Sequence, residues 1–164
     1  MTIVGAVCAN TRFEGLVVGE ARQDGWNATD ALCRLLLGGK YLPQLHVILL
    51  DGIAIGGFNV IDLEALARRL KRPCVAVMRR PPDMAAVEDA VRKLPRSERR
   101  IALLHRAGPI HITPPFVFQV RGALPQEVGP ALALFTDTGK VPEPLRLAHL
   151  IGGAIARGES TRRA

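Results

Sequence analysis

The segment that most constrains the fold is LHVILLDGIAIGGFN, residues 45–59. Residues 46–50 form a short, almost wholly apolar run, which is typical of a strand buried on both faces of a mostly parallel sheet. The run ends in Asp51, and sites in open α/β sheets lie beyond the carboxyl ends of the strands. Asp51 is therefore a candidate metal ligand or proton-transfer group. The alternative interpretation is a turn residue, because Asp-Gly is a common turn dipeptide.

A parallel crossover is predicted to follow this strand. Residues 60–70 have the apolar spacing of a packed surface helix, and residues 73–78 form a second buried apolar run. A strand, helix and strand in this order form a right-handed parallel unit, so Asp51 and the pair Arg79 and Arg80 should face the same crevice. A solvated loop is the alternative for the arginine pair. The segment between the strands carries residues suited to tight turns, ligand approach or helix capping, and we expect them to contact nucleic acid: Gly52, Gly56, Gly57 and Asn59.

The remaining elements follow from periodicity and from turn residues. Residues 2–8 and 13–21 should pair as an antiparallel hairpin, and residues 110–121 should be extended, with Pro114 and Pro115 making the first half an edge or loop. The helix over residues 27–37 should be capped by Asn27 or Thr29, and its first turn holds Asp30. Asp30 either complements the helix N-terminus or joins a metal site. Further helices are predicted over residues 83–94, 97–106, 125–136 and 142–157.

The last predicted helix presents two faces. Its core face should consist of four apolar residues, Leu147, Leu150, Ile151 and Ala154. Arg146, His149 and Gly153 share another face, three to four residues apart. A histidine beside an apolar stripe is either a packed, hydrogen-bonded residue or a catalytic group, and the spacing leaves both open.

Composition narrows the class of protein. The 164 residues suit one domain, with residues 158–164 as a frayed tail. A net charge of +7 indicates either a polyanionic partner or an arginine-rich surface, and 4% aromatic residues argue against base stacking as the main binding mode. Three distant cysteines indicate buried, reduced thiols, and the absence of a membrane span or secretion signal predicts a cytoplasmic protein. No serine-hydrolase, P-loop, nucleotide-binding or HExxH motif is present.

Several ordered blocks resemble one known family over nearly the whole chain. The blocks are DGWNAT, YLPQLHVILLDGIAIGGFNVIDLEAL, RPCVAVMRRPPD, RRIALLHRAGPIH and GKVPEPLRLAHLIGGAIARGES. They resemble the domain-of-unknown-function family ninety-nine, the endonuclease dU family, which is similar to endonuclease V. The resemblance implies a ribonuclease H-like α/β fold, with a mixed sheet and helices on both faces. It also implies an endonuclease, dependent on Mg²⁺ or Mn²⁺, that nicks DNA near deoxyuridine or deoxyinosine in DNA repair.

The resemblance also implies roles for particular residues. The strand-end acid of the family falls on Asp51, the upstream acid on Asp30 by ungapped spacing, and the histidine of the last block on His149. Asp51 and Asp30 would bind the metal, and Arg79, Arg80 and Arg146 would hold the backbone of DNA or RNA. Arg79 replaces a lysine of that family, and Gly57 replaces a histidine.

The resemblance departs from the family at the start of the chain. A first strand with another catalytic Asp normally precedes the piece matching residues 3–7, and residues 1–11 contain no acid. The family acid in DGWNAT is Asn27 here. A missing strand would leave unpaired backbone that needs a partner. The alternatives are a start assigned too late, a homodimer that completes the sheet, or a non-catalytic nucleic-acid-binding or structural relative.

Overall fold

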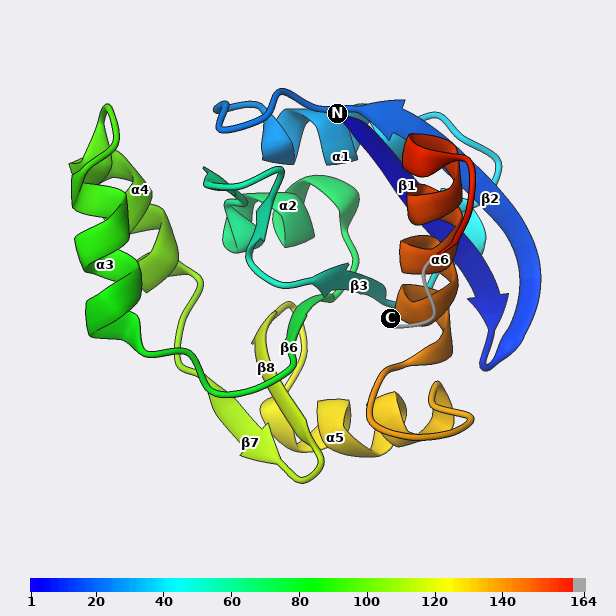
Figure 1. Ribbon diagram of the computed structural model, residues 1–164. Coiled ribbons are helices and arrows are strands. Elements are labelled where there is room, and N and C mark those ends of the chain that lie inside the picture. The colour runs from blue at the N-terminus through cyan, green and yellow to red at the C-terminus, as the bar shows by residue number, and fades with distance from the viewer. Residues whose placement is uncertain (161–164) are drawn as a thin grey trace.

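The computed structural model describes residues 1–160, which form a mixed α/β fold with a four-stranded sheet between helices (Figure 1). This confirms the predicted fold class. Residues 161–164, part of the predicted frayed tail, lie outside the described residues. The elements are β1 Thr2–Ala9, β2 Arg12–Glu20, α1 Ala28–Leu36, a short 3₁₀ turn Leu42–Gln44, β3 Ile48–Asp51, β4 Ala54–Ile55, β5 Asn59–Val60, α2 Leu63–Leu70, β6 Cys74–Met78, α3 Met84–Arg92, α4 Ser97–Arg106, β7 His111–Thr113, β8 Phe116–Arg121, α5 Pro125–Leu134 and α6 Glu143–Arg157.

Strands β1 and β2 form the predicted antiparallel hairpin. Thr2 pairs with Glu20 and Ala9 with Arg12, so two residues make the turn. Asn10 occupies the left-handed region there, with φ of 55°. Asparagine tolerates this conformation better than most side chains, which explains how the hairpin turns without a glycine.

The four-stranded sheet has the order β3-β6-β8-β7. Strand β3 is parallel to β6, as the crossover pattern predicted, and β8 is antiparallel to β6. Asp51 pairs with Val77, so Arg79 follows the neighbouring strand only two residues further along. Strand β7, next to the two prolines, lies at the sheet edge, where the missing proline N–H groups break no ladder.

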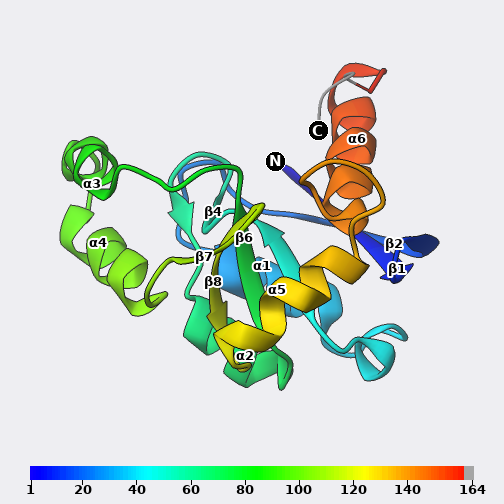
Figure 2. The same cartoon turned by 90° about the horizontal axis from the view of Figure 1, so that it is seen from below.

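Alternating residues of the sheet face two cores. Leu50, Cys74 and Ala76 pack with the buried residues of α1 and α2. Val75 and Val77 belong to the other core with residues of α5 and with Leu145 of α6. Figure 2 accordingly shows α6 on one side of the sheet and α2 on the other. The sheet is therefore covered on both faces, as its apolar strands require.

The β1–β2 hairpin and the four-stranded sheet are separate sheets. Among residues 1–160, β1 pairs with β2 alone and β3 pairs with β6 alone. Each strand therefore keeps one edge without backbone partners in the described chain. Strand β3 is consequently less enclosed than its apolar sequence predicted, since Leu50 is buried but Ile48 and Leu49 are half-buried.

The predicted cap of α2 is wrong, and the predicted cap of α1 is right in position but makes no capping bond. Helix α2 begins at Leu63, where Asp62 rather than Asn59 is the cap, and the Asp62 carboxylate accepts from the Ala65 N–H at 3.1 Å. Asn27 occupies the cap position of α1 without a side-chain capping bond. The Ala28 N–H instead donates to Asn59 Oδ1 at 2.9 Å, so the first turn of α1 is capped from β5.

Helix α6 also differs from its prediction. The buried residues of this helix are Leu145 and Gly153, whereas the four predicted core residues, Leu147, Leu150, Ile151 and Ala154, are only half-buried. The helix is apolar around much of its circumference, so the pattern did not single out the face that contacts β1. No helix within residues 1–160 has the length and apolar character needed to cross a membrane.

Candidate active site

Asp51 and His149 come together from two elements distant in sequence. Asp51 ends β3, and His149 lies in the second turn of α6. His149 Nδ1 is 3.9 Å from Asp51 Oδ2, and the two side chains are 36% and 54% exposed. This distance exceeds that of a hydrogen bond, so the contact is an ion pair when the imidazole is protonated. Both groups remain accessible to a ligand.

This pair lies in a groove of about 600 Å³. Strands β1 and β3 and helices α1 and α6 supply the lining, through residues 1–8, residues 47–51 and apolar side chains that include Leu32, Leu36 and Leu145. Within residues 1–160, the acidic and basic side chains in the lining are Asp51, His149 and Arg157, beside the polar Thr2 and Asn10. Most of the other lining side chains are apolar.

The glycines after Asp51 allow the backbone to turn, because they adopt positive φ angles. Gly52 has a φ of 84°, and its N–H donates to Val77 O at 2.9 Å, which fixes the turn at the strand end. At Gly57, φ is 83°, and an added Cβ would lie 2.2 Å from Asp24 Oδ1. The same Asp24 oxygen accepts from the Phe58 N–H at 2.9 Å. These bonds hold the loop after β3 against the turn that precedes α1. A nucleic-acid contact at Gly52, Gly56 or Gly57 stays a prediction.

Asn59, predicted to contact nucleic acid, is fully buried. Its Oδ1 caps α1, and its Nδ2 donates to Arg22 O at 2.8 Å and to Asn27 Oδ1 at 3.0 Å. Both polar atoms are therefore engaged inside the protein, so in this structure the side chain positions α1 and offers nothing to a ligand.

Sequence reasoning did not identify Arg100 as part of this region. Arg100 is 2% exposed, and its guanidinium donates to Phe58 O and, at 2.8 Å, to Asp24 O. It also lies over the Trp26 ring, 4.1 Å from the centroid. In a charged stretch such as SERRIALLHR an arginine looks exposed. One feature of the sequence could have indicated that Arg100 is buried: it lies four residues before Leu104, on the same face of the helix, and these two are the buried residues of α4.

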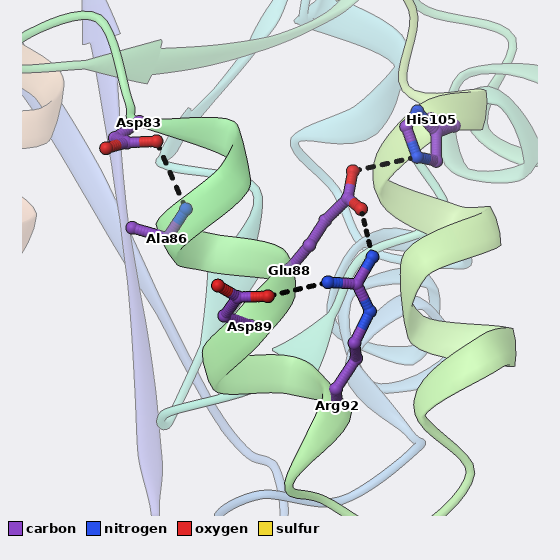
Figure 3. Close-up of polar contacts among 6 residues, drawn as sticks. All are labelled: Asp83, Ala86, Glu88, Asp89, Arg92 and His105. Atoms are coloured by element: carbon purple, nitrogen blue, oxygen red, sulfur yellow. Dashed lines mark hydrogen bonds and ion pairs between the residues drawn. The ribbon is translucent and has the colours of Figure 1, made fainter.

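Helices α3 and α4 form a separate pair beside this loop (Figure 3). Asp83 caps α3 by accepting from the Ala86 N–H at 3.1 Å. Glu88 of α3 contacts Arg92 at 3.1 Å and His105 of α4 at 3.0 Å. The Glu88 carboxylate therefore links α3 to α4 through its contact with the His105 imidazole.

Asp30 is engaged away from the groove. Its Oδ1 accepts from Arg69 Nη1 of α2 at 2.6 Å, and it is not among the residues that line the groove with Asp51 and His149. The ion pair raises the pKa of the Arg69 guanidinium through the hydrogen bond from its side chain to Asp30. The structure therefore gives Asp30 a helix-bridging contact, and its role as a metal ligand stays a prediction.

The predicted phosphate-binding arginines differ in whether an acid of the protein already pairs with them. Arg79 and Arg80 are exposed immediately after β6. Arg146 instead donates from Nε to Glu143 at 2.7 Å, within the first turns of α6. That hydrogen bond lowers the pKa of Glu143 and raises the pKa of Arg146. A phosphate at Arg146 would have to share it with Glu143.

The described residues offer few ligands for a metal ion. Within residues 1–160 no group of three or more His, Cys, Asp and Glu side chains is placed to hold one. Mg²⁺ accepts one or two protein carboxylates and takes its other ligands from water and substrate phosphate. Asp51 fits as one such carboxylate, being exposed at a strand end. The groove supplies no second acid from the described chain.

The cysteines are free thiols. Cys33 and Cys74 are buried, as predicted, whereas Cys8 is half-buried. Burial raises the pKa of Cys74 to about 12, and burial is also the main cause of the raised pKa of Cys8. Burial likewise is the main cause of the raised pKa of Cys33. All three thiols therefore stay protonated near neutral pH, which makes them poor nucleophiles.

Comparison with known proteins places the chain in a family. It is similar to a UPF0215 protein of Archaeoglobus fulgidus, with 37% identity over 99% of this chain and 90% of the relative. A UPF0215 protein of Deinococcus radiodurans is 40% identical over 96% of this chain and 81% of the relative. The crystal structure of a protein of unknown function from Archaeoglobus fulgidus superposes with a TM-score of 0.91 and 36% identity, covering 94% of this chain and 89% of that one. The family model for endonuclease dU matches residues 1–156, and the chain therefore belongs to the endonuclease dU family.

Proposed function

We propose that this protein nicks DNA next to deaminated bases, deoxyuridine or deoxyinosine, and that Asp51 and His149 form its catalytic pair. The observation that carries the proposal is the convergence of these two side chains, 3.9 Å apart, at the carboxyl end of β3. Membership of the endonuclease dU family supports a nuclease. The net charge of +7 supports a polyanionic substrate.

The residues at the site have separate tasks in this proposal. Asp51 presents an exposed carboxylate at a rigid strand end, where it can orient a water molecule toward phosphorus. His149 Nδ1 lies 3.9 Å from that carboxylate, so a phosphate bound at Asp51 would come close to a proton carried by His149. Arg79 and Arg80 hold the phosphate backbone on the neighbouring strand end.

Asp51 is also the residue that would hold Mg²⁺ or Mn²⁺. Such an ion would neutralise phosphate charge and lower the pKa of a bound water. Because the described residues provide one acid in the groove, water and DNA phosphate would complete the coordination.

Replacement of Asp51 tests the proposal. Asp51→Asn keeps the shape of the side chain and removes its charge, so nicking of a deoxyuridine duplex in Mg²⁺ should fall by at least ~100-fold. Asp89→Asn is the matched control, because Asp89 is an exposed acid on α3 that pairs with Arg92. Its nicking rate should equal that of the unmodified protein. Equal rates for all three proteins would exclude Asp51 from catalysis.

A second candidate is a nucleic-acid-binding protein that does not cut. The shortage of acids around Asp51 among residues 1–160 favours it. This candidate predicts binding that weakens steeply with salt, as counterion release requires, without any product that depends on Mg²⁺. The same duplex assay separates the two candidates, because only the first yields a nicked strand that disappears in EDTA.

A further inference from the structure

Arginines of α4 surround Trp26, the only tryptophan of the chain. The guanidinium carbon of Arg100 lies 4.1 Å from the centre of the Trp26 ring. Those of Arg99 and Arg96 lie 5.5 Å and 5.7 Å from it, within the range of a cation–π contact. Arg100 is buried, whereas Arg96 and Arg99 are exposed. Trp26 therefore gathers two solvent-accessible cations, and these three residues, Trp26, Arg96 and Arg99, are called the arginine cluster below.

The arginine cluster lacks an acid that would neutralise it. In the part of the chain that the structure describes, neither Arg96 nor Arg99 forms an ion pair, whereas Arg92 of α3 and Arg106 of α4 both do. Like charges beside one ring repel each other, and cations in the first turn of a helix oppose its dipole. The cluster is therefore short of negative charge, which a bound anion would supply.

The loop after β3 joins the arginine cluster to the strand end that carries Asp51. Gly56 O accepts from the Asp24 N–H at 2.8 Å, and the Arg100 guanidinium donates to Phe58 O. The chain from Asp51 to Phe58 spans at most ~25 Å, whereas one turn of a DNA duplex is ~34 Å long. The cluster thus lies at most about one duplex turn from Asp51, so one duplex can contact both.

We propose that Arg96 and Arg99, held against Trp26, bind the phosphate backbone of DNA at a second contact outside the Asp51 site. The choice of DNA as the anion rests on the proposed function. Guanidinium groups carry paired N–H donors that match the oxygens of a phosphate. Because Arg100 lies over the Trp26 ring, the cluster suits a phosphate better than it suits a stacked base.

Binding of a dye-labelled DNA duplex in EDTA tests the cluster without cleavage. Arg96→Gln combined with Arg99→Gln removes both exposed cations. This double variant should bind at least ~10-fold more weakly at low salt, and the slope of its salt dependence should be shallower by about 1 to 2.

The matched control combines Arg12→Gln with Arg92→Gln. It removes the same charge, but from exposed arginines that pair with acids of the protein. Because such pairs are already neutralised, the control should bind DNA within about 2-fold of the unmodified protein. Circular dichroism shows whether each double variant is folded.

Trp26 reports on the cluster in the unmodified protein, because its fluorescence is that of the only tryptophan. It is half-buried, and the two cations beside it attract iodide, an anionic quencher. DNA bound at the cluster should exclude iodide and lower the quenching constant at least ~2-fold. In the variant that lacks both arginines, DNA should leave iodide quenching unchanged.

Four results would overturn the proposal. The two double variants weaken binding equally, which reduces the effect to net charge, or saturating DNA leaves iodide quenching of the unmodified protein unchanged. Alternatively, the unmodified protein does not bind the duplex, or it binds polyglutamate more tightly than DNA at equal salt, which assigns the cluster to an acidic protein. Nicking by Asp51→Asn is measured separately in Mg²⁺, so either proposal can fail while the other stands.

Discussion

Single buried polar residues fix the loop that carries the candidate site. Asn59 makes three hydrogen bonds and Arg100 makes two to the loop and turn, and both side chains are almost completely buried. A buried polar atom that loses its hydrogen-bond partner costs the full desolvation penalty of that unsatisfied atom. The region after Asp51 is therefore rigid because of residues that never reach the solvent.

Asn59→Ala should lower the free energy of unfolding by about 3 kcal/mol, because it leaves the Ala28 N–H without an acceptor and opens a small cavity. Gln23→Ala is the control, since Gln23 is exposed and should change stability by less than about 0.5 kcal/mol. Urea denaturation measures both. A loss below about 1 kcal/mol at Asn59 would contradict the role given to this network.

Gly57 and Gly139 offer a matched pair of substitutions. Both have positive φ, 83° and 77°, but an added Cβ meets Asp24 only at Gly57 and meets nothing within 4 Å at Gly139. Gly139→Ala should therefore cost about 1 kcal/mol of backbone strain, and Gly57→Ala at least about 2 kcal/mol. Thermal unfolding compares them, and equal losses would show that the contact with Asp24 has no energetic weight.

At this scale the sequence predicted the site only in part. Asp51 and His149 were identified, and the structure brings them together. The capping role of Asn59 was assigned to the wrong helix, because its partner Ala28 lies 31 residues away. Arg100 was missed for the same reason. Local patterns identify which residue types are present, whereas the partners of a buried polar group are set by tertiary packing.

At the scale of elements, α6 contributes His149 and contacts both β1 and β3. Periodicity predicted its length but not its inner face, because apolar residues surround the helix. Helix α2 has a polar face opposite its apolar one, and the apolar spacing of residues 60–70 predicted it; its buried residues are Leu63, Leu66, Ala67 and Leu70. The buried face of a helix can be predicted from sequence when a polar face lies opposite the apolar one.

The start of α6 should respond to pH through Glu143. Its pKa is lowered by the hydrogen bond from Arg146, so the folded state favours the charged carboxylate. That stabilisation is present above the ordinary pKa of 4.5 and is lost as the pH falls through the lower folded-state value. Glu143→Gln should cost up to about 1 kcal/mol at pH 7 and almost nothing near pH 2. Urea denaturation at the two values checks it, and an equal cost at both would contradict the assignment.

At the scale of the whole molecule, the apolar strands, the crossover and the hairpin were predictable because each rests on local periodicity. The separation of the hairpin from the four-stranded sheet was expected only from the resemblance to the endonuclease dU family. In the structure the two sheets are separated by a groove of about 600 Å³, which lies between strand edges that have no backbone partner within residues 1–160 and has Asp51 and His149 in its lining. Pairing between distant strands has no local signal, so no pattern within residues 2–8 or 45–51 could reveal it.

The central claim is that Asp51 and His149 act as one catalytic site. It is tested most directly by comparing nicking of a deoxyuridine duplex by Asp51→Asn, His149→Asn and the double variant. Residues that act as a unit are strongly non-additive, so the double variant should be no more than about threefold slower than the slower single variant. Losses that multiply, or single variants that nick as fast as the unmodified protein, would contradict the claim.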